Sequence, residues 1–345
     1  MAANLRQVAA LAGVSAATVS RVFSNPEAVR ERTRQRVTDA ARELGWSPNQ
    51  TARSLALGRT GNIGLMIPDA SNPVFGVAIK DVQQFARERG FALFVVVGDG
   101  ATEDERALAH AAARKVDGLI LVAPRMSPVQ LSELRSISPL ALVNRESEGS
   151  PSTSIPSEDG MQALVEHLAE MGHHRIVYLA GPKFSPSNAH RLHAFQKTAN
   201  SQGIEALTLG PFEFDYMAAG RAAADDVLAS GATAAIGYND LVAVGLITEL
   251  HRRGTQPGRD IAVAGFDGSW LGETTSPALT SVELPFAEAI RWAVLDLIEL
   301  LEGTRTATAR KLPSRLIIRA STSQPFQQGS PPQPQPTQQP LLTTP

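Results

Sequence analysis

Apolar residues recur along this chain with two different periods. Up to about residue 46 they lie three or four residues apart, which is the spacing of amphipathic helices. This pattern predicts a first helix that begins at Leu5 and is broken at Gly13, a second over 16–23 and a third from about 30 to 44. The residues expected to face inward are Leu5, Val8 and Leu11 in the first helix, Val19 and Val22 in the second, and Val37, Ala41 and Leu44 in the third.

Polar residues mark where these helices start, and glycines mark where they stop. Asn4 can cap the first helix, and Gln7 stands three residues later at the capping-box position. Ser15 can cap the second helix. Gly13 and Gly45 follow the first and third helices, because glycine adopts the left-handed conformation that ends a helix. Two short helices joined by a glycine turn are typical of a helix-turn-helix unit.

From Gly61 the pattern changes to short, nearly continuous apolar runs separated by helical stretches. Such runs are typical of strands that are buried on both faces of a parallel sheet. Two series of them predict two α/β lobes, with a cleft at the carboxyl ends of the strands. The runs are 62–68, 92–98, 117–124 and 140–144 in the first series, and 175–181, 234–240 and 261–267 in the second. A helix over 286–301 and a strand over 315–319 are expected to complete the lobes.

The second helix carries side chains on its outer side that suit contact with DNA. In a helix-turn-helix the second helix enters the major groove. Arg21 can donate two hydrogen bonds to guanine, and the small Ala16 and Ala17 can approach a thymine methyl group. Hydroxyl groups can bond phosphates, and those in position to do so belong to Ser15, Thr18, Ser20 and Thr33. The alternative is an ordinary three-helix bundle with a solvated polar face.

Two segments make this interpretation more specific: VAALAGVSAATVSRV in the helical head, and SPNQTARSLALGRT at 47–60. Together they resemble the lactose-repressor (LacI/GalR) family, and the resemblance extends over about the first 320 positions. It implies that the segment from Pro48 to Leu57 is a hinge helix that folds on the operator. It also implies DNA contacts by Asn49, Arg53 and Leu55, with Leu55 wedged into the minor groove. The alternative for Leu55 is a linker residue that packs against its own domain.

The resemblance implies an all-α helix-turn-helix head and a hinge helix, joined to an α/β two-lobed body like that of periplasmic sugar-binding proteins. The chain is expected to cross between the lobes three times. The expected domains are the DNA-binding head at 1–46, the hinge helix and linker at 47–60, the effector-binding and dimerisation body at 61–320, and a tail at 321–345. The tail is rich in proline and glutamine, a composition that predicts disorder.

The ends of the predicted strands carry candidate effector-binding groups. Polar side chains bond hydroxyl groups in fixed directions, while aromatic faces cover the apolar side of a small ligand. The candidates are Asp69 and Phe75, in a segment similar to the family's DxxNPFF motif, then Asn144, Arg191, Phe212, Asn239 and Asp267. The resemblance implies that Arg191 clamps sugar hydroxyls or carboxylates. Asn239 and Asp267 can instead cap the helices that follow their strands.

Several positions depart from the family pattern. Asn144 stands where many relatives have aspartate, Gly268 where a second aspartate is frequent, and Leu284 where glutamine is common. The pocket can therefore differ from a standard hexose site, or the effector need not be a sugar. In the head, Arg30 replaces the usual serine cap of the third helix, which weakens that helix slightly.

Charge is divided unevenly along the chain. Residues 1–60 hold nine arginines and four acidic residues, a net charge of +5, which leaves −7 for the remainder because the whole chain carries −2. A basic head on an acidic body is expected when only one domain meets phosphates. Part of this charge can equally belong to a solvated arginine face on the third helix.

Other kinds of chemistry find little support. There is no cysteine, hence no disulfide or thiol chemistry. Neither a signal peptide nor a membrane-spanning apolar run is found, so we expect a cytoplasmic protein without a membrane partner. His167, His173 and His174 resemble a structural junction of the family, and no acidic or cysteine cluster accompanies them. Without a metal site, a nucleotide-binding glycine motif or a nucleophile–base pair, we expect no cofactor and no enzymatic activity.

These features predict a sequence-specific, DNA-binding transcriptional regulator, with repression as the family's usual mode. As a homodimer it binds a palindromic DNA operator, under the control of a small-molecule effector related to carbohydrates. The leucine heptad of tetrameric relatives is missing, which favours the dimer. The alternatives are a cytoplasmic solute-binding protein without a regulatory role, an α/β enzyme, a DNA-architectural protein, and an activator of the same family.

Overall fold

The computed structural model describes residues 3–24, 26–46, 59–98, 102–212, 215–304 and 308–323. The chain divides into two compact units. One runs to Asn62 and includes Lys115–Asp117, and the other comprises Ile63–Arg114 and the chain from Gly118 onward. The predicted hinge helix and most of the predicted tail lie outside the described residues, and with them Asn49, Arg53 and Leu55.

The head consists of three helices around a small apolar core. They are α1 (Leu5–Ala12), α2 (Ala16–Ser24) and α3 (Glu31–Glu43), with the 3-10 turn η1 (Pro26–Ala28) between α2 and α3. Val8, Val19 and Val37 are fully buried among them, as the helical spacing predicts. Leu11 differs from the prediction, because it is 48% exposed. The buried side of α1 is formed by Val8, Ala9 and Ala12, which lie on a helix face that Leu11 does not share.

The predicted helix ends of the head are confirmed. The Asn4 side chain accepts the Gln7 N–H at 3.1 Å, while the Gln7 side chain accepts the Asn4 N–H at 2.9 Å. Gly13 adopts a left-handed conformation with φ of +60° and ends α1. The Thr18 N–H donates to Ser15 Oγ at 3.1 Å, so Ser15 caps α2. Arg30 precedes α3 without a side-chain hydrogen bond to it, as its type predicts.

The body begins with a six-stranded sheet in the order β11-β5-β4-β3-β1-β2. Its strands are β1 (Asn62–Ile67), β2 (Ala92–Val97), β3 (Gly118–Val122), β4 (Leu140–Val143), β5 (Ser152–Ser154) and β11 (Ala309–Lys311). The pairs β1–β3, β3–β4, β4–β5 and β5–β11 are parallel. Its helices are α5 (Pro73–Arg87), α6 (Thr102–Ala113), α7 (Pro128–Arg135) and α13 (Phe286–Glu302).

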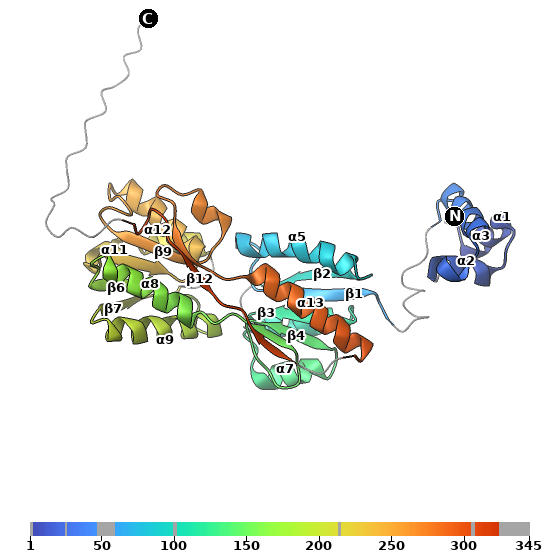
Figure 1. Ribbon diagram of the computed structural model, residues 1–345, viewed down its shortest axis with the longest axis horizontal. Coiled ribbons are helices and arrows are strands. Elements are labelled where there is room, and N and C mark those ends of the chain that lie inside the picture. Colours follow the sequence, from blue (N-terminus) through green and yellow to red (C-terminus); the bar gives the residue numbers. More distant parts are fainter. Residues whose placement is uncertain are drawn as a thin grey trace, which may run out of the picture. The chain divides into compact units, whose positions relative to one another are not determined.

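Alternate residues of the central strands pack against different helices. Leu65 and Ile120 belong to the core that includes α5 and α13, whereas Leu119 belongs to the core that includes α6 and α7. Figure 1 shows α5 and α13 beside this sheet, with α7 below it. The continuous apolar runs of β1, β3 and β4 therefore reflect burial on both faces, as predicted.

Strand β2 contradicts the same prediction. It lies at the edge of the sheet, and Phe94, Val95 and Val97 are 42%, 37% and 42% exposed. An apolar run shows that a strand favours burial, but it does not show whether a neighbouring strand or helix of the same chain covers it. The expectation that the run 92–98 is buried on both faces is therefore wrong for this chain taken alone.

The second sheet has the order β12-β10-β9-β8-β6-β7. Its strands are β6 (Arg175–Leu179), β7 (Glu205–Leu209), β8 (Ala234–Gly237), β9 (Ala262–Asp267), β10 (Thr280–Glu283) and β12 (Arg315–Ile317), of which β12 is antiparallel to β10. The helices of this lobe are α8 (Glu158–Glu170), α9 (Pro186–Ser201), α10 (Tyr216–Ala222), α11 (Ala224–Ala229) and α12 (Asp240–Arg252), with the 3-10 turn η2 (Trp270–Glu273). The chain crosses between the sheets after β5, after β10 and after β11, which confirms the three expected crossings.

The predicted fold class is confirmed by these two sheets behind a helical head. Helix α13 and strand β12 complete the lobes where the sequence places them. Strands β5, β7, β10 and β11 were not predicted, being short or mixed in polarity. Among the described residues, no helix has both the length and the hydropathy needed to cross a membrane.

Candidate functional site

The head presents its candidate DNA-binding residues on α2 and at the start of α3. Ser15, Ala17, Ser20 and Arg21 are exposed, while Ala16, Thr18 and Thr33 are partly buried. Ser15 and Thr18 share a hydrogen bond of 2.9 Å between their hydroxyl groups. The outer side of α2 thus combines small residues, hydroxyl groups and one arginine, which suits close approach to a groove.

Five of the seven predicted effector residues line one cavity between the two lobes. The cavity encloses about 50 Å³ and is bordered by Asp69, Phe75, Arg191, Asn239 and Asp267. Phe75 and Arg191 lie within the first two turns of α5 and α9. Asp69 follows β1, Asn239 follows β8 and Asp267 ends β9. They meet because parallel strands direct their carboxyl ends to the same edge of a sheet. Ligand pockets are usually about 300–1,000 Å³, so the space enclosed here is small for a ligand of ordinary size.

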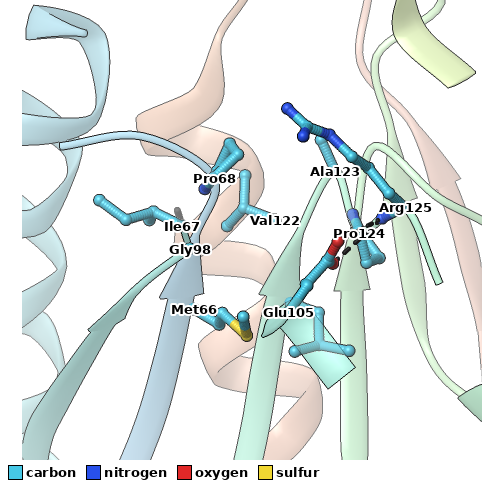
Figure 2. A pocket seen from close by; sticks show the side chains of 10 residues that line it. Met66, Ile67, Pro68, Gly98, Glu105, Val122, Ala123, Pro124 and Arg125 are labelled. Atoms are coloured by element: carbon cyan, nitrogen blue, oxygen red, sulfur yellow. Dashed lines mark hydrogen bonds between the residues drawn. The ribbon is translucent and has the colours of Figure 1, made fainter. Parts of the chain in front are cut away.

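Further residues of this cavity were not predicted. Arg125 follows β3, Ser185 and Ser187 flank the start of α9, and Tyr216 and Tyr238 contribute aromatic rings. Figure 2 shows Arg125 and Ala123 at the end of β3, close to Pro68 at the end of β1. Arg125, Ser185 and Tyr238 lie in the loops that follow strands, and this position is the signal in the sequence that could have identified them.

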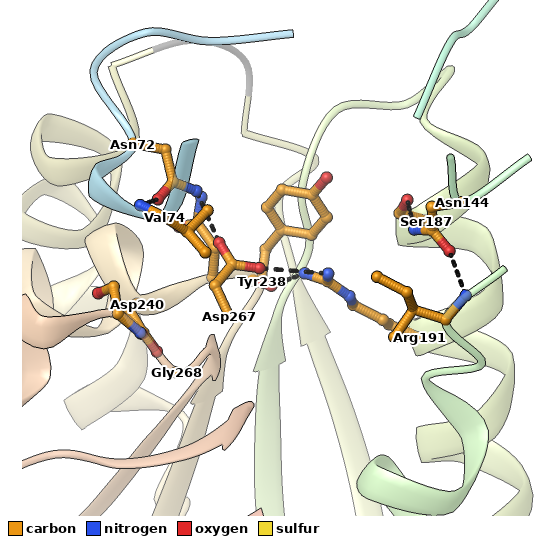
Figure 3. A network of polar contacts seen from close by, with 12 residues as sticks. Asn72, Val74, Asn144, Ser187, Arg191, Tyr238, Asp240, Asp267 and Gly268 are labelled. Carbon is orange, nitrogen blue, oxygen red and sulfur yellow. Dashed lines mark hydrogen bonds and ion pairs between the residues drawn. The ribbon is translucent and has the colours of Figure 1, made fainter. Parts of the chain in front are cut away.

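Arg191 is the centre of a buried polar network. Its side chain is 4% exposed, and its Nη1 donates to the Tyr238 carbonyl oxygen at 2.5 Å. Its Nη2 lies 3.4 Å from Asp267 Oδ1. The Asn72 amide donates to the other oxygen of Asp267 at 2.6 Å. Figure 3 shows the side chains of Asn72, Asp267 and Arg191 side by side, with the ring of Tyr238 above them. The guanidinium carbon also lies 4.9 Å from the ring centre of Tyr238, a cation–π arrangement.

In this network, burial disfavours the charged forms of Arg191 and Asp267, whereas their ion pair favours them. Burial disfavours the charge of Arg191, but neighbouring Asp267 raises the pKa of the guanidinium, which therefore stays positive. Burial raises the pKa of Asp267, whereas Arg191 and the Asn72 amide act in the opposite direction. The two groups are therefore mutually dependent, since removal of either leaves a buried charge without its partner.

A third carboxylate, Asp240, lies buried next to this network at the start of α12. It accepts the Ser269 N–H at 2.6 Å and the Ser281 hydroxyl at 2.5 Å. Burial and the nearby charge of Asp267 raise its pKa to about 7, although both hydrogen bonds favour the charged form. Asp240 does not border the cavity. Its hydrogen bond with the Ser269 N–H holds the backbone behind Asp267.

Between the described residues, two hydrogen bonds join the lobes at this cavity or beside it. One is the bond from Asn72 to Asp267, and the other runs from Asn144 Nδ2 to Ser187 Oγ at 3.3 Å. Asn144 does not border the small cavity as expected. It lines a neighbouring cavity of about 430 Å³, which shares Ser187 with the first. Asn144 has a left-handed backbone with φ of +55°, and its side-chain oxygen accepts the Ile155 N–H at 3.3 Å.

The remaining predicted effector residues behave differently from one another. Phe212 does not border either cavity but packs against the core beside α12, where its N–H donates to the Ala180 carbonyl at 2.9 Å. Tyr216 supplies the aromatic surface in its place. Asn239 both lines the cavity and caps α12 by accepting the Val242 N–H at 3.0 Å. Asp267 caps no helix, because both of its oxygens face the network of Arg191.

Two of the histidines singled out in the sequence, His167 and His173, have structural partners. His167 bonds the Thr322 hydroxyl at 2.9 Å, and His173 bonds the Thr233 hydroxyl at 3.0 Å. Burial lowers the pKa of both, that of His173 to about 4. Across the described part of the chain, no group of three histidine or acidic side chains is arranged to hold a metal ion.

Comparison with known proteins assigns a family to each part. Residues 4–49 match the family of bacterial regulatory proteins named after lacI, and residues 165–322 match the periplasmic binding protein-like domain. The transcriptional repressor CytR of Escherichia coli (strain K12) is 30% identical over 337 residues, which cover 93% of this chain and 96% of the repressor.

Solved structures agree with this assignment. The lac repressor dimer bound to operator and the anti-inducer ONPF has a TM-score of 0.82 at 26% identity, covering 93% of this chain and 99% of its own. The complex of the transcriptional regulator CelR with cellobiose has a TM-score of 0.67 at 27% identity, covering 92% and 99%. The similarity therefore includes the helical head as well as the two lobes.

Proposed function

This chain belongs to the lacI family of bacterial regulatory proteins and is a DNA-binding transcriptional regulator, and we propose that it acts as an effector-controlled repressor. It binds a palindromic operator as a homodimer, and its effector is a small carbohydrate-like molecule. The observation that carries this proposal is the presence of an exposed recognition helix and a buried polar cavity in one chain.

DNA recognition is assigned to the outer side of α2. Arg21 offers two donors to a guanine, while Ala17 and Ser20 leave room for the helix to approach the bases. Ser15 and Thr33 bond phosphates and fix the position of the helix in the groove. In the segment 47–60, proposed as hinge and linker, Asn49 and Arg53 contact the operator, and Leu55 enters the minor groove and bends it.

The exposed apolar edge of the first sheet supports the homodimer. Phe94, Val95 and Val97 on β2 are joined by Val77 on α5, which is 56% exposed. A long apolar edge strand that faces water is rare in a monomer, because it promotes association. A second copy of the chain covers this surface in the proposed dimer, and the similar lac repressor was solved as a dimer.

The cavity supports effector control because its polar groups come from both lobes. A ligand that competes for Asp267 or Ser187 changes the hydrogen bonds that join the lobes. It can alter operator affinity only if it binds the two lobe arrangements with different affinity. The carbohydrate class rests on the paired amide, carboxylate and guanidinium groups beside aromatic rings, and on the cellobiose bound by similar CelR.

The experiment compares operator binding with oligomeric state. Operators selected from random inverted repeats are titrated with wild type, Phe94→Asp and, as the matched control, Val129→Asp, which changes an apolar residue 68% exposed on α7. Light scattering should report a dimer for wild type and control, and a monomer with weak operator binding for Phe94→Asp. A Phe94→Asp variant that remains dimeric would exclude this surface, and wild-type protein without preference for inverted repeats would refute the proposal.

A second variant tests the hinge separately. Leu55→Ala should lower operator affinity while effector binding by the body is unchanged, because the wedge unstacks bases and contacts no ligand. A gel-shift titration measures the operator affinity, and calorimetry measures the effector affinity. Equal operator affinity for Leu55→Ala and wild type would show that no wedge forms.

A further inference from the structure

Arg125 adds to the interlobe cavity a positive charge that the family motifs in the sequence do not account for. It follows β3 and borders the cavity together with Asp69 and Tyr216. Figure 2 shows its side chain extending beyond the strand ends, on the side away from Glu105. With Arg191 on the opposite lobe, guanidinium groups thus reach the cavity from both lobes.

The backbone of Arg125 is held in place by a half-buried carboxylate. Glu105 on α6 accepts the Arg125 N–H with both of its oxygens, at 3.0 and 3.1 Å. The preceding Ala123 has a φ of +47°, a left-handed conformation that residues with a Cβ rarely adopt, and Pro124 restricts the next φ. A hydrogen bond to a charged acceptor is strong enough to offset such strain. Glu105 therefore fixes the point from which the Arg125 side chain enters the cavity.

The carboxylates that border the cavity are already occupied by protein donors. Asp69 accepts the N–H and the hydroxyl group of Ser71, each at 2.7 Å. Asp267 accepts from Asn72 and Arg191. The positive charge of Arg191 offsets that of Asp267, whereas the hydrogen bonds from Ser71 stabilise the charged form of Asp69.

Helix ends add a further positive potential. The residues that cap α5, α9 and α12, namely Asn72, Ser185 and Asn239, all border the cavity. Three helices of 15, 16 and 13 residues therefore direct their N-termini, the positive ends of their dipoles, toward the same space.

A buried donor in the same place lacks an acceptor. Arg191 Nε is inaccessible to solvent and has no hydrogen-bond partner within the described residues. Buried donors without partners are costly, so the donors of Arg191 are not all satisfied by the described part of the protein.

We propose that the effector is an anionic carbohydrate, a sugar that carries a phosphate or carboxylate group, and that Arg125 binds this group. The proposal rests on the proposed effector control and makes it specific. Glu105 is a positioning residue that acts through the backbone of Arg125. The sugar hydroxyls are bound by the polar groups around Arg191, so charge and sugar are recognised by different parts of the cavity.

The test compares neutral sugars with their anionic derivatives on the full-length chain. Calorimetry is used with D-ribose and D-ribose 5-phosphate, with D-glucose, D-gluconate and D-glucose 6-phosphate, and with inorganic phosphate alone. At least one anionic sugar should bind ten or more times more tightly than its neutral parent. Arg125→Met should reduce that preference about 10- to 100-fold, because hydrogen bonds between charged groups have this strength, while Arg125→Lys retains part of it.

Two further variants separate positioning from general effects on the fold. Glu105→Gln should lower the preference for the anionic sugar more than it changes affinity for the neutral parent. Arg114→Met, an exposed arginine after α6, serves as the matched control and should bind like wild type. A preference that Arg125→Met retains, binding of neutral sugars alone, or no binding of any anionic sugar would overturn the proposal. If neutral sugars bind and change operator affinity, the effector-controlled repressor stands while its anionic effector is refuted.

Discussion

Arg21 and Arg191 show how differently one residue type is used in the two units. Arg21 on α2 is exposed and forms no hydrogen bond with the described residues, whereas Arg191 is buried between Tyr238 and Asp267. When Arg21 contacts DNA, the base replaces water around the guanidinium. The contact therefore contributes to the free energy of DNA binding and not to that of folding. Arg191 is part of the folded body, so a change there affects stability and ligand binding together. The recognition surface of the head is thus exposed, whereas the side chains around the cavity depend on one another for stability.

The largest expected effect is that of Arg191→Met. The substitution leaves Asp267 buried without its cation and should lower the free energy of unfolding of the body by about 3–5 kcal/mol. It should also abolish the response to effector while the head still binds operator. Urea denaturation and operator titrations measure the two effects. The double variant with Asp267→Asn should recover part of the stability, and a single variant as stable as wild type would show that the pair is not interlocked.

The second prediction concerns pH. The pKa of Asp240 is raised to about 7 by burial, so the folded state keeps this proton while the unfolded chain loses it near pH 4. Stability from this group is present below about pH 4 and is lost as pH rises toward about 7, by at most about 4 kcal/mol. Asp240→Asn should flatten this part of the stability profile. Asp226→Asn, an exposed aspartate on α11, is the control, and an unchanged slope in Asp240→Asn would contradict the assignment.

Arg21→Gln should affect DNA binding without affecting stability. Loss of a bidentate contact to guanine should weaken operator binding by about 1–3 kcal/mol, measured by fluorescence anisotropy. Arg32→Gln, an exposed arginine on α3, is the control for simple loss of positive charge. Equal losses in the two variants, at every operator sequence, would show that Arg21 contributes only nonspecific attraction.

The smallest effect is expected for the cap of α2. Ser15→Ala removes the acceptor of the Thr18 N–H and should destabilise the head by about 1 kcal/mol. Ser20→Ala changes an exposed serine on the same helix and should have a much smaller effect. Thermal denaturation followed by circular dichroism compares the two. If both variants have the same melting temperature as wild type, the hydrogen bond of Ser15 does not stabilise α2.

The sequence predicts the helical head better than the two-lobed body. Helix periodicity and caps are local signals, so the bounds of α1 to α3 and the exposure of Arg21 follow from neighbouring residues. The position of Leu11 was missed, since the angle at which α1 meets the other helices decides which side is buried. In the body, the strand runs predict the sheets and the cavity edge, but β2 looks the same in sequence as the buried β1.

Which residues line the cavity can be decided only from the tertiary structure, and the reason is physical. Arg191 and Asp267 follow from family motifs, one on α9 and the other at the end of β9. Arg125 carries no motif, and its place in the cavity depends on the strained turn at Ala123 and on Glu105, 20 residues earlier in the chain. Phe212 and Tyr216 are four positions apart, and only the path of the chain after β7 decides which ring reaches the cavity.

The most direct test of the account measures the coupling between cavity and operator in both directions. Operator affinity is determined with and without a saturating effector, and effector affinity is determined with and without operator. We expect both affinities to change by the same factor, typically 5- to 150-fold, because the two sites share one coupling free energy. If neither the operator affinity nor the effector affinity changed, the cavity would not control the head.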